Sequence, residues 1–474
     1  MMHRRHFLST LAAGPAIGAA PMLAQSGSRS KQNVLFISID DLNDWIGCLG
    51  GHPDAKTPNL DRLAARGVLF TNSHCNAPLC NPSRASIMTG LRPSTTGIYD
   101  NGQPMRKSPV IAKATTVTQH FRAHGYDVMG GGKIYHTAYP DAASWDSYFP
   151  SQTKNKPDDV RPQTVPANGI KGAANFDWGQ VNVKDEEMGD AQVVAWASGE
   201  LKKARTKPFF LACGIYRPHL PWYVPPRYFD AFVKGELKMP RVKDDDLDDV
   251  PPTGIKWAKP NGDHATVVKS GKYRDAVQAY LACIHFADAQ VGKLLDALDA
   301  SPHAKNTIVV LWSDHGWHLG EKLHWRKFSL WEEATHNVLM MSAPGVTKPG
   351  GRCTRPVSLI DVYPTLCDLA GVPLRDELEG VTLRPLLTNP KAAWERPVVT
   401  TYFKDNHAVR SERWRYIHYA DGGEELYDEL ADPQEWTNLA KKPEYAAVKQ
   451  ELSRWLPNVN APESVHERGA NFEN

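Results

Sequence analysis

The chain has 474 residues, 41% of them hydrophobic and 23% charged, which is enough to bury one substantial core and a smaller one. Its formal net charge of +2 argues against a nucleic-acid partner, because such proteins carry a strong basic excess or a basic stripe. The 36 prolines and 35 glycines are spread through the sequence, which indicates long ordered loops rather than a low-complexity tail.

The N-terminus has the features of an export signal. A basic start, MMHRRHFLST, is followed by the small-residue apolar stretch LAAGPAIGAAPMLA. The Arg4-Arg5 pair favours a twin-arginine signal over a general secretory one, and its predicted extent is residues 1–24. No later segment is apolar enough to span a membrane. We therefore expect a periplasmic or secreted bacterial protein without stable membrane insertion, exported folded by the twin-arginine route.

Four apolar runs each lead directly into charged or imidazole side chains. They are NVLFISIDDL (33–42), YDVMGGGKIYH (126–136), FFLACGIYRPH (209–219) and TIVVLWSDHG (307–316). Continuous apolar runs of this length are typical of strands buried on both faces of a parallel sheet. In such sheets the ligand site lies beyond the carboxyl ends of the strands. We therefore expect the four polar clusters to converge on one pocket.

Between these runs lie amphipathic helix patterns, at 57–67, 190–205 and 273–300. Strand and helix alternate, so the predicted fold class is α/β, with a large mixed, mostly parallel sheet flanked by helices. From about residue 395, short strand-like pieces predict a smaller C-terminal antiparallel sheet subdomain. The predicted domains are thus a catalytic domain at 30–394 and a subdomain at 395–474. An acidic run at 244–249 is expected to be a solvated loop.

Two of the clusters suggest a metal site. The adjacent carboxylates Asp40 and Asp41 repel each other after a buried strand unless a cation lies between them. Asp314 and His315 would supply the opposite side. Taken alone, each pair is better explained by a helix cap or a turn. Carboxylates suit Ca²⁺ or Mg²⁺ and an imidazole suits zinc, so these residues leave the metal's identity open.

Cationic side chains accompany the other strand ends. Lys133 and His136 lie in GGGKIYH, His219 in YRPHLPW and Lys327 in HWRKFS. A single residue of this kind is usually a surface or packing residue. Several together near a metal make sense only if the ligand is itself a multiply charged anion.

The stretch CNPSRASIMTG places Cys80 at the start of a predicted helix, with Pro82 in its first turn. Free N–H groups and the helix dipole favour an anion there. Arg84 lies one turn further in. Cys80 is either a nucleophile or a structural thiol, and the odd total of seven cysteines leaves at least one unpaired or altered. Cys213 and Cys283 lie in apolar runs and are expected to be buried.

CNPSRASIMTG matches the signature Cys-x-Pro-Ser-Arg followed by Thr-Gly, and in this motif the chain resembles the type I sulfatases of the alkaline-phosphatase-like superfamily. The resemblance covers most of the chain after the signal, including NVLFISIDDL, TPNLDRLAARGVLFTNSHC and LWSDHGWHLGE. Within the family, GKIYH, GIYRPHLPW and WRKFSLWEEATHNVL look most like the iduronate-2-sulfatase branch.

The resemblance implies that a formylglycine-generating enzyme converts Cys80 to formylglycine. One hydroxyl of the hydrated aldehyde would attack sulfur to give a sulfated enzyme, and the other would then allow sulfate to be expelled. Asp40, Asp41, Asp314 and His315, together with the modified Cys80, would hold a divalent metal, Ca²⁺ in most of the family and with Mg²⁺ as an alternative. Most of the family has asparagine or glutamine in place of His315, whereas the iduronate-2-sulfatase branch also has histidine.

The remaining catalytic positions follow from the same resemblance. Arg84 and Lys133 would stabilise the formylglycine hydrate, and His136 would assist the expulsion of sulfate. His219 and Lys327 would contact the sulfate group, and one of them would protonate the leaving oxygen.

Residues near these motifs suggest a sugar as the rest of the substrate. Aromatic and imidazole side chains follow two clusters, at Trp222, Trp317, His318 and His324. Trp317 and His324 are the predicted substrate-binding residues, although such groups also suit loop packing. Arginines of the C-terminal subdomain that could reach a sugar carboxylate are Arg410, Arg413 and Arg415. For at least two of these, a solvated strand face is the favoured interpretation.

The sequence therefore predicts a sulfuric ester hydrolase that acts on a sulfated carbohydrate. One alternative is a phosphonate monoester or phosphodiester hydrolase, since relatives with that activity share Cys-x-Pro-x-Arg. Another is a non-catalytic protein that binds sulfated glycans. The second alternative predicts the loss of cluster residues, yet every expected position is occupied.

Overall fold

Three of the apolar runs form neighbouring parallel strands at the middle of the main sheet. The computed structural model describes residues 31–172 and 175–467. β1 (Asn33–Ile39) lies between β7 (Phe209–Ile215) and β9 (Thr307–Ser313), and all residues of the three strands are buried. Burial on both faces explains why these strands are apolar throughout instead of alternating between apolar and polar residues.

The main sheet has eight strands. Their order is β13 (Gly351–Cys353), β2 (Val68–Phe70), β12 (Leu339–Ser342), β9, β1, β7, β4 (Asp127–Gly132) and β5 (Ser147–Phe149). Only β12 runs antiparallel to its neighbours; the other adjacent pairs are parallel. The prediction of a mixed, mostly parallel sheet is confirmed.

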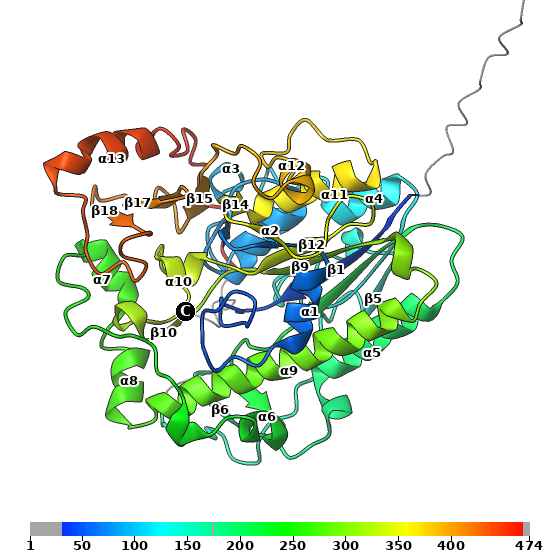
Figure 1. Ribbon diagram of the computed structural model, residues 1–474, viewed down its shortest axis with the longest axis horizontal. Helices are drawn as coiled ribbons and strands as arrows, with labels where there is room; N and C mark the ends of the chain where they lie inside the picture. Colours follow the sequence, from blue (N-terminus) through cyan, green and yellow to red (C-terminus); the bar gives the residue numbers. More distant parts are fainter. Residues whose placement is uncertain (1–30, 173–174, 468–474) are drawn as a thin grey trace, which may run out of the picture. The chain divides into compact units, whose positions relative to one another are not determined.

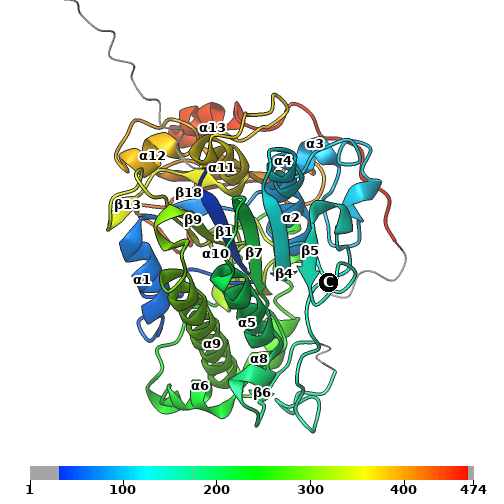
Figure 2. The same cartoon turned by 90° about the vertical axis from the view of Figure 1, so that its right-hand side faces the viewer.

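Helices cover both faces of this sheet (Figures 1 and 2). On one face lie α1 (Pro58–Arg66), α5 (Gly189–Lys202) and α9 (Tyr273–Asp299), and on the other α2 (Cys80–Thr89), α4 (Val117–Ala123) and α11 (Val362–Ala370). Alternate residues of β1 serve the two faces, because Leu35 and Ile37 pack with the first group and Val34 and Phe36 with the second. Each such side chain contributes about 1.5–3 kcal/mol by burial.

The C-terminal part forms a separate four-stranded antiparallel sheet, as expected. In chain order its strands are β15 (Val398–Thr401), β16 (His407–Arg410), β17 (Trp414–His418) and β18 (Glu424–Asp428), and α13 (Ala446–Ser453) follows. One face shares an apolar cluster with Leu79, the residue before Cys80, and with Trp331. The small sheet therefore supports the start of α2.

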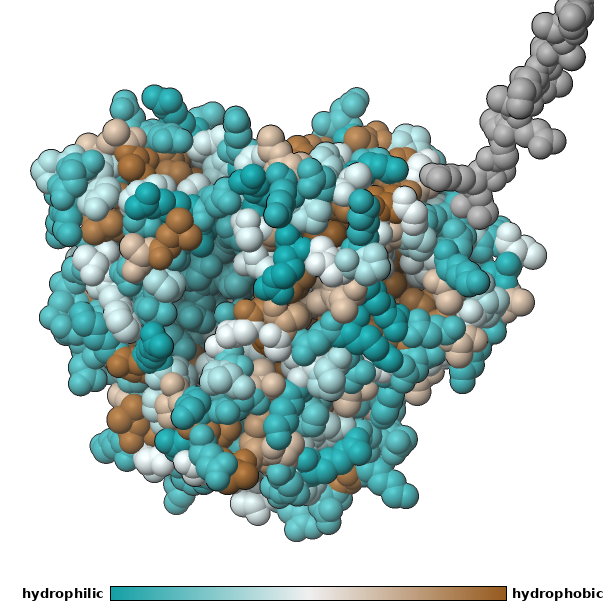
Figure 3. All heavy atoms as spheres, in the orientation of Figure 1, coloured by the Kyte–Doolittle hydropathy of each residue, from teal (hydrophilic) through white to brown (hydrophobic). Residues whose placement is uncertain are grey.

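The remaining elements are short. The helices are α3 (Pro93–Thr96), α6 (Pro226–Asp230), α7 (Pro252–Ala258), α8 (Asp263–Lys269), α10 (Glu332–Thr335) and α12 (Arg384–Thr388). The short strands are β3 (Ser73–His74), β6 (Trp178–Gln180), β8 (Trp222–Val224), β10 (His318–Leu319), β11 (Trp325–Arg326) and β14 (Val357–Ser358). On the face drawn in Figure 3, hydrophilic residues predominate and hydrophobic ones form small separate groups.

The acidic run at 244–249 is not wholly solvated. Asp244, Asp245 and Asp248 are exposed, but Asp246 is buried and lies 2.8 Å from Lys322 Nζ. The expectation fails there because a buried lysine, distant in sequence, supplies a partner charge.

All seven cysteines are free thiols in the structure, and Cys213 and Cys283 are fully buried as predicted. Among the described residues, no helix is both long and apolar enough to cross a membrane. The predicted export signal at 1–24 lies outside the described residues.

Candidate active site

The carboxyl ends of neighbouring strands bring the polar clusters together. Asp40 and Asp41 follow β1, and Asp314 follows β9 directly. Lys133 follows β4, and the segment after β7 carries His219. Since β9, β1, β7 and β4 are adjacent and parallel, their ends meet at one edge of the sheet. This is the convergence that the strand-end pattern predicts.

Helix α2 brings Cys80 to the same edge. Leu79, immediately before it, is extended (φ −163°, ψ 154°), and Pro82 lies in the first turn, where its missing N–H leaves no hydrogen bond unmade. Every residue of the helix is buried. Asn101 Oδ1 accepts a hydrogen bond of 3.0 Å from the Asn81 backbone N–H. Side-chain support of this kind fixes the helix start that carries Cys80.

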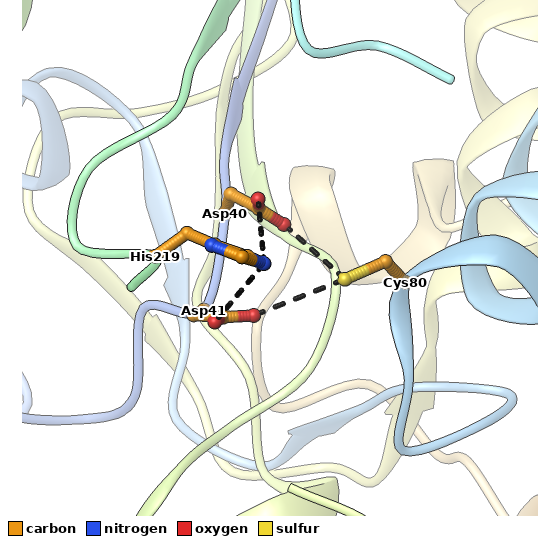
Figure 4. A group of neighbouring side chains, drawn as sticks. All are labelled: Asp40, Asp41, Cys80 and His219. Atoms are coloured by element: carbon orange, nitrogen blue, oxygen red, sulfur yellow. Dashed lines mark hydrogen bonds and ion pairs between the residues drawn. The ribbon is translucent and has the colours of Figure 1, made fainter. Parts of the chain in front are cut away.

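Groups of both charges surround the sulfur of Cys80. Its Sγ lies 3.6 Å from Asp40 Oδ1 and 3.9 Å from Asp41 Oδ1 (Figure 4). Lys327 Nζ lies 2.9 Å from Sγ and Lys133 Nζ 3.7 Å from it. Burial, and then the negative charge of Asp40, raise the pKa of the Cys80 thiol. The unmodified side chain is therefore a neutral thiol rather than an activated thiolate.

Arg84 neutralises two of the carboxylates from within the core. Its Nη2 donates to Asp40 Oδ1 and its Nε to Asp314 Oδ2, both at 2.9 Å. Burial alone would raise the pKa of Asp40, but Lys133 and Arg84 outweigh it and hold that pKa well below its usual value. Asp40 is therefore a carboxylate at neutral pH.

Two overlapping groups of buried side chains offer ligand atoms for a cation. One comprises Asp40, Asp41, Cys80 and His219, and the other Asp40, Cys80, Asp314 and His315. Within each group, the atoms that could serve as ligands lie within 4.8 Å of one another. Such a concentration of buried carboxylates is stable only with compensating positive charge.

The orientation of His315 fits a metal ligand. Its Nδ1 faces the carbonyl oxygen of Gly316 at 2.9 Å, so Nε2 points at Asp41 Oδ1, 3.3 Å away. Burial lowers the pKa of His315, which leaves a neutral imidazole with a lone pair on Nε2. Asp41 Oδ2 is buried and accepts no hydrogen bond within the described ranges. The residues present therefore fit a divalent cation.

A cavity of about 770 Å³ opens onto this cluster. Predicted site residues in its wall are Asp41, His136, His219, Trp317 and Lys327. His219 Nε2 lies 3.8 Å from Asp41 Oδ2, and Lys327 Nζ lies 2.9 Å from Asp41 Oδ1. The ammonium group of Lys327 and the imidazole of His219 thus line the cavity together with Asp41, where an anionic ligand would meet them.

Comparison with known protein families agrees with this arrangement. The profile described as Sulfatase matches residues 32–372, which is most of the chain. The chain belongs to the sulfatase family. A second profile, described as N-sulphoglucosamine sulphohydrolase, C-terminal, matches residues 320–461 of this sulfatase.

Relatives of known sequence carry related names. The chain is 41% identical over 445 residues to a sulfatase of Formosa agariphila, covering 91% of this chain and 87% of that protein. It is 33% identical over 393 residues to mouse iduronate 2-sulfatase, covering 72% and 69% of the two chains. The predicted likeness to iduronate 2-sulfatase is confirmed.

Solved structures share the fold. One, determined in complex with its substrate D-glucosamine-2-N,6-O-disulfate, has a TM-score of 0.72 and 23% identity, and the match covers 90% of this chain and 96% of that one. The phosphonate monoester hydrolase of Agrobacterium radiobacter has a TM-score of 0.73 and 24% identity, with 90% and 94% covered. Identities this low establish the sulfatase's fold and not its substrate.

The two predicted substrate-binding residues of the sulfatase differ in position. Trp317 lies in the cavity wall, with Lys327 Nζ 5.6 Å from its ring centroid. His324 is buried outside that wall. Its Nδ1 faces the backbone oxygen of Ala258 at 2.7 Å and its Nε2 that of Lys327 at 2.5 Å. His324 thus contacts the Lys327 backbone and does not line this cavity, and its role in substrate binding stays a prediction.

The C-terminal arginines are also placed differently from the expectation. Arg415 is fully buried, with Nε 3.1 Å from Glu429 Oε1, and it also pairs with Glu332. Arg410 Nε lies 3.1 Å from Glu332 Oε2, whereas Arg413 is about half exposed. A solvated strand face is therefore wrong for Arg410 and Arg415, and the cavity wall contains none of the three arginines.

Much of the cavity wall comes from residues that the sequence did not single out. They include 153–159, Arg161, Tyr216, Tyr223 and Arg326. Their segment at 153–161 reads as an ordinary polar, proline-containing loop. Its two lysines, followed closely by two aspartates, were the available signal, but such charge clusters are common in solvated loops.

Proposed function

We propose that this sulfatase hydrolyses the sulfate ester of a sulfated carbohydrate. Water is consumed, the bond between sulfur and the sugar oxygen breaks, and the products are a sugar hydroxyl and inorganic sulfate. The observation that carries this proposal is the position of Cys80, whose Sγ lies 2.9 Å from Lys327 Nζ and beside Asp41, two residues that line the cavity. The resemblance to iduronate 2-sulfatase supports a sugar as the substrate.

The nucleophile would come from Cys80 after its conversion to formylglycine by a maturating enzyme. That conversion replaces the sulfur on Cβ by oxygen, so Sγ marks where the oxygens of the hydrated aldehyde would lie. In this place Lys133 and Lys327 would favour a negatively charged oxygen. The neutral, buried thiol of the unmodified residue is a weak nucleophile by comparison.

A divalent cation, Ca²⁺ or Mg²⁺, would be held by Asp40, Asp41, Asp314 and His315, with the modified Cys80. When bound, the cation supplies Lewis-acid polarisation of the sulfate oxygens. Arg84 keeps Asp40 and Asp314 in place and charged through its two hydrogen bonds of 2.9 Å.

The remaining residues would act on the substrate. Lys327 and His219 line the cavity beside the carboxylates and would hold the sulfate group by charge and hydrogen bonding. One of the two would protonate the sugar oxygen as it leaves. His136, also in the wall, would assist the release of sulfate.

Release of inorganic sulfate from defined sugar sulfates tests the proposal. Protein made together with a maturating enzyme should release sulfate, and the Cys80→Ala variant should lose at least about a thousandfold in kcat because it lacks the nucleophile. Faster cleavage of phosphonate monoesters or phosphodiesters than of any sulfate ester would favour the alternative hydrolase. Binding of a sulfated glycan without any turnover would favour the non-catalytic alternative.

A further inference from the structure

Away from the carboxylate cluster, the cavity wall carries four lysine or arginine side chains and two aspartates. They are Lys154, Lys156, Asp158, Asp159, Arg161 and Arg326. Most of them come from one loop, 153–161. Where a wall has a charge that its own residues do not neutralise, a ligand of opposite charge is favoured.

Each of the wall's other lysines and arginines has a carboxylate partner in the structure. Lys154 Nζ lies 2.8 Å from Asp158 Oδ2, and Lys156 pairs with Asp159. Those four charges cancel within the loop.

The two cationic wall residues at 326 and 327 are paired in the same way. Arg326 Nε donates to Asp263 Oδ2 at 2.6 Å, and Lys327 Nζ lies 2.9 Å from Asp41 Oδ1. The side chain of Arg326 is only 17% exposed, which limits how far it can turn from this partner.

Arg161 is the exception. It is exposed, lies in the cavity wall, and makes no ion pair or hydrogen bond with any residue in 31–172 or 175–467. It is close enough to Tyr223 for its charge to oppose the burial and the Asp177 contact that raise the Tyr223 pKa. Tyr223 is itself fixed, because its hydroxyl donates to Asp177. Arg161 thus stands beside a rigid aromatic side chain in the same cavity as His219 and Lys327.

The cavity is large enough for a ligand that is bigger than a sulfate group. Its volume of about 770 Å³ falls within the roughly 300–1,000 Å³ typical of sites for small organic ligands. A sulfate group alone would fill a small part of it. Tyr216, Tyr223 and Trp317 contribute aromatic surface to the remaining wall.

We propose that Arg161 binds a second anionic group of the substrate, a carboxylate or a further sulfate ester on the sugar whose sulfate is removed. This inference rests on the proposed function and assigns a specificity residue to it. The planar guanidinium offers parallel N–H donors that match the two oxygens of either anion. Because Arg161 has no ion-pair partner among the described residues, binding the anion breaks none of the ion pairs that the structure describes.

The test compares substrates that differ by one charge. A hexuronic acid O-sulfate, its carboxyl methyl ester, and a hexosamine with one or two sulfate groups are assayed with wild type, Arg161→Ala and Arg161→Lys. Lys154→Ala is the matched control, since Lys154 is exposed on the same loop but already paired. We expect Arg161→Ala to lower kcat/KM for a doubly charged sugar roughly 10- to 100-fold, mainly through KM. The methyl ester and the monosulfated sugar should be unaffected, and Arg161→Lys should lose less.

The set of substrates distinguishes a carboxylate from a second sulfate ester as the anion that Arg161 binds. A loss confined to the uronate assigns a carboxylate, and a loss confined to the disulfated sugar assigns a second sulfate. If Arg161→Ala keeps the wild-type ratio of kcat/KM between the uronate and its methyl ester, and between the disulfated and monosulfated hexosamine, the inference is overturned. The release of sulfate by the same proteins would still establish the sulfatase activity. If wild type releases no sulfate from any member, the proposed function fails. Calorimetric binding of the same sugars to Cys80→Ala, with and without Arg161→Ala, then decides the role of Arg161 separately.

Discussion

Cys80 depends on its neighbours for any reactivity. Five side chains place a charged or ligand atom within 3.9 Å of its sulfur, and they come from four different stretches of chain. Burial makes each of these charges strong, and pairing makes their burial tolerable. Arg84, for example, keeps Asp40 charged although the carboxylate has no access to water.

Glu321, outside the catalytic cluster, has a carboxyl group whose pKa is changed by its surroundings. Burial, and then the nearby Asp44 and Asp246, raise the pKa of this carboxyl from 4.5 to about 7. The folded protein therefore binds a proton that the unfolded chain releases between these pH values. Stability from this group is fully present below the unfolded pKa of 4.5 and is lost as the pH rises to about 7.

We therefore expect Glu321→Gln, which stays neutral and keeps an acceptor for the Leu319 N–H, to match wild type near pH 4 and to be more stable by about 2–3 kcal/mol at pH 8. Urea unfolding across this range measures the difference. A constant offset between the two proteins, independent of pH, would show that Glu321 is already ionised in the folded state at pH 5.

At the scale of elements, the small C-terminal sheet is joined to the rest by a buried ion-pair network. Arg415 of β17 meets Glu332 of α10, and also Glu429 at 3.1 Å and Glu435 at 2.7 Å. Glu332 is 83 residues away in sequence. The network therefore holds β17 against α10, near the apolar cluster that includes Leu79.

Removing Arg415 should be costly, because three carboxylates would lose a buried partner. We expect Arg415→Met to lower the free energy of unfolding by about 3–5 kcal/mol in urea titrations. Arg413→Met is the control from the same segment, since Arg413 is half exposed although its partner Asp428 is buried, and we expect it to cost at most about 1 kcal/mol. Similar losses in both variants would mean that the network does not stabilise the docking of the sheet.

The local parts of this architecture follow from the sequence. Strands buried on both faces, helices with apolar stripes and polar clusters at strand ends are short-range patterns, and α5, α9 and the convergence of Asp40 with Asp314 follow from them. Even the start of α2 at Cys80 is marked by Pro82.

The parts that could not be predicted depend on contacts between distant segments. Nothing near Arg415 shows that Glu332 of α10 will pair with it, and nothing in the 153–161 loop shows that it lines the same cavity as Trp317. His324 has the residue type of a sugar-binding group, but its two backbone partners fix it behind Lys327. Such outcomes are set by tertiary packing rather than by local pattern.

At the scale of the whole molecule, the proposed activity depends on one covalent change. The fold brings a cavity, a cation site and Cys80 together, and only an aldehyde at position 80 would make this arrangement a sulfatase of the proposed kind. The same chain with an intact thiol has a buried, protonated cysteine beside two lysines and no strong nucleophile.

Mass spectrometry of the peptide that contains Cys80 is the most direct measurement. It is made on the full-length protein produced together with a maturating enzyme, and the same sample is assayed for sulfate release. We expect the peptide to carry formylglycine, with activity rising in proportion to the converted fraction. Full activity in a sample whose Cys80 is an unmodified thiol would contradict the account.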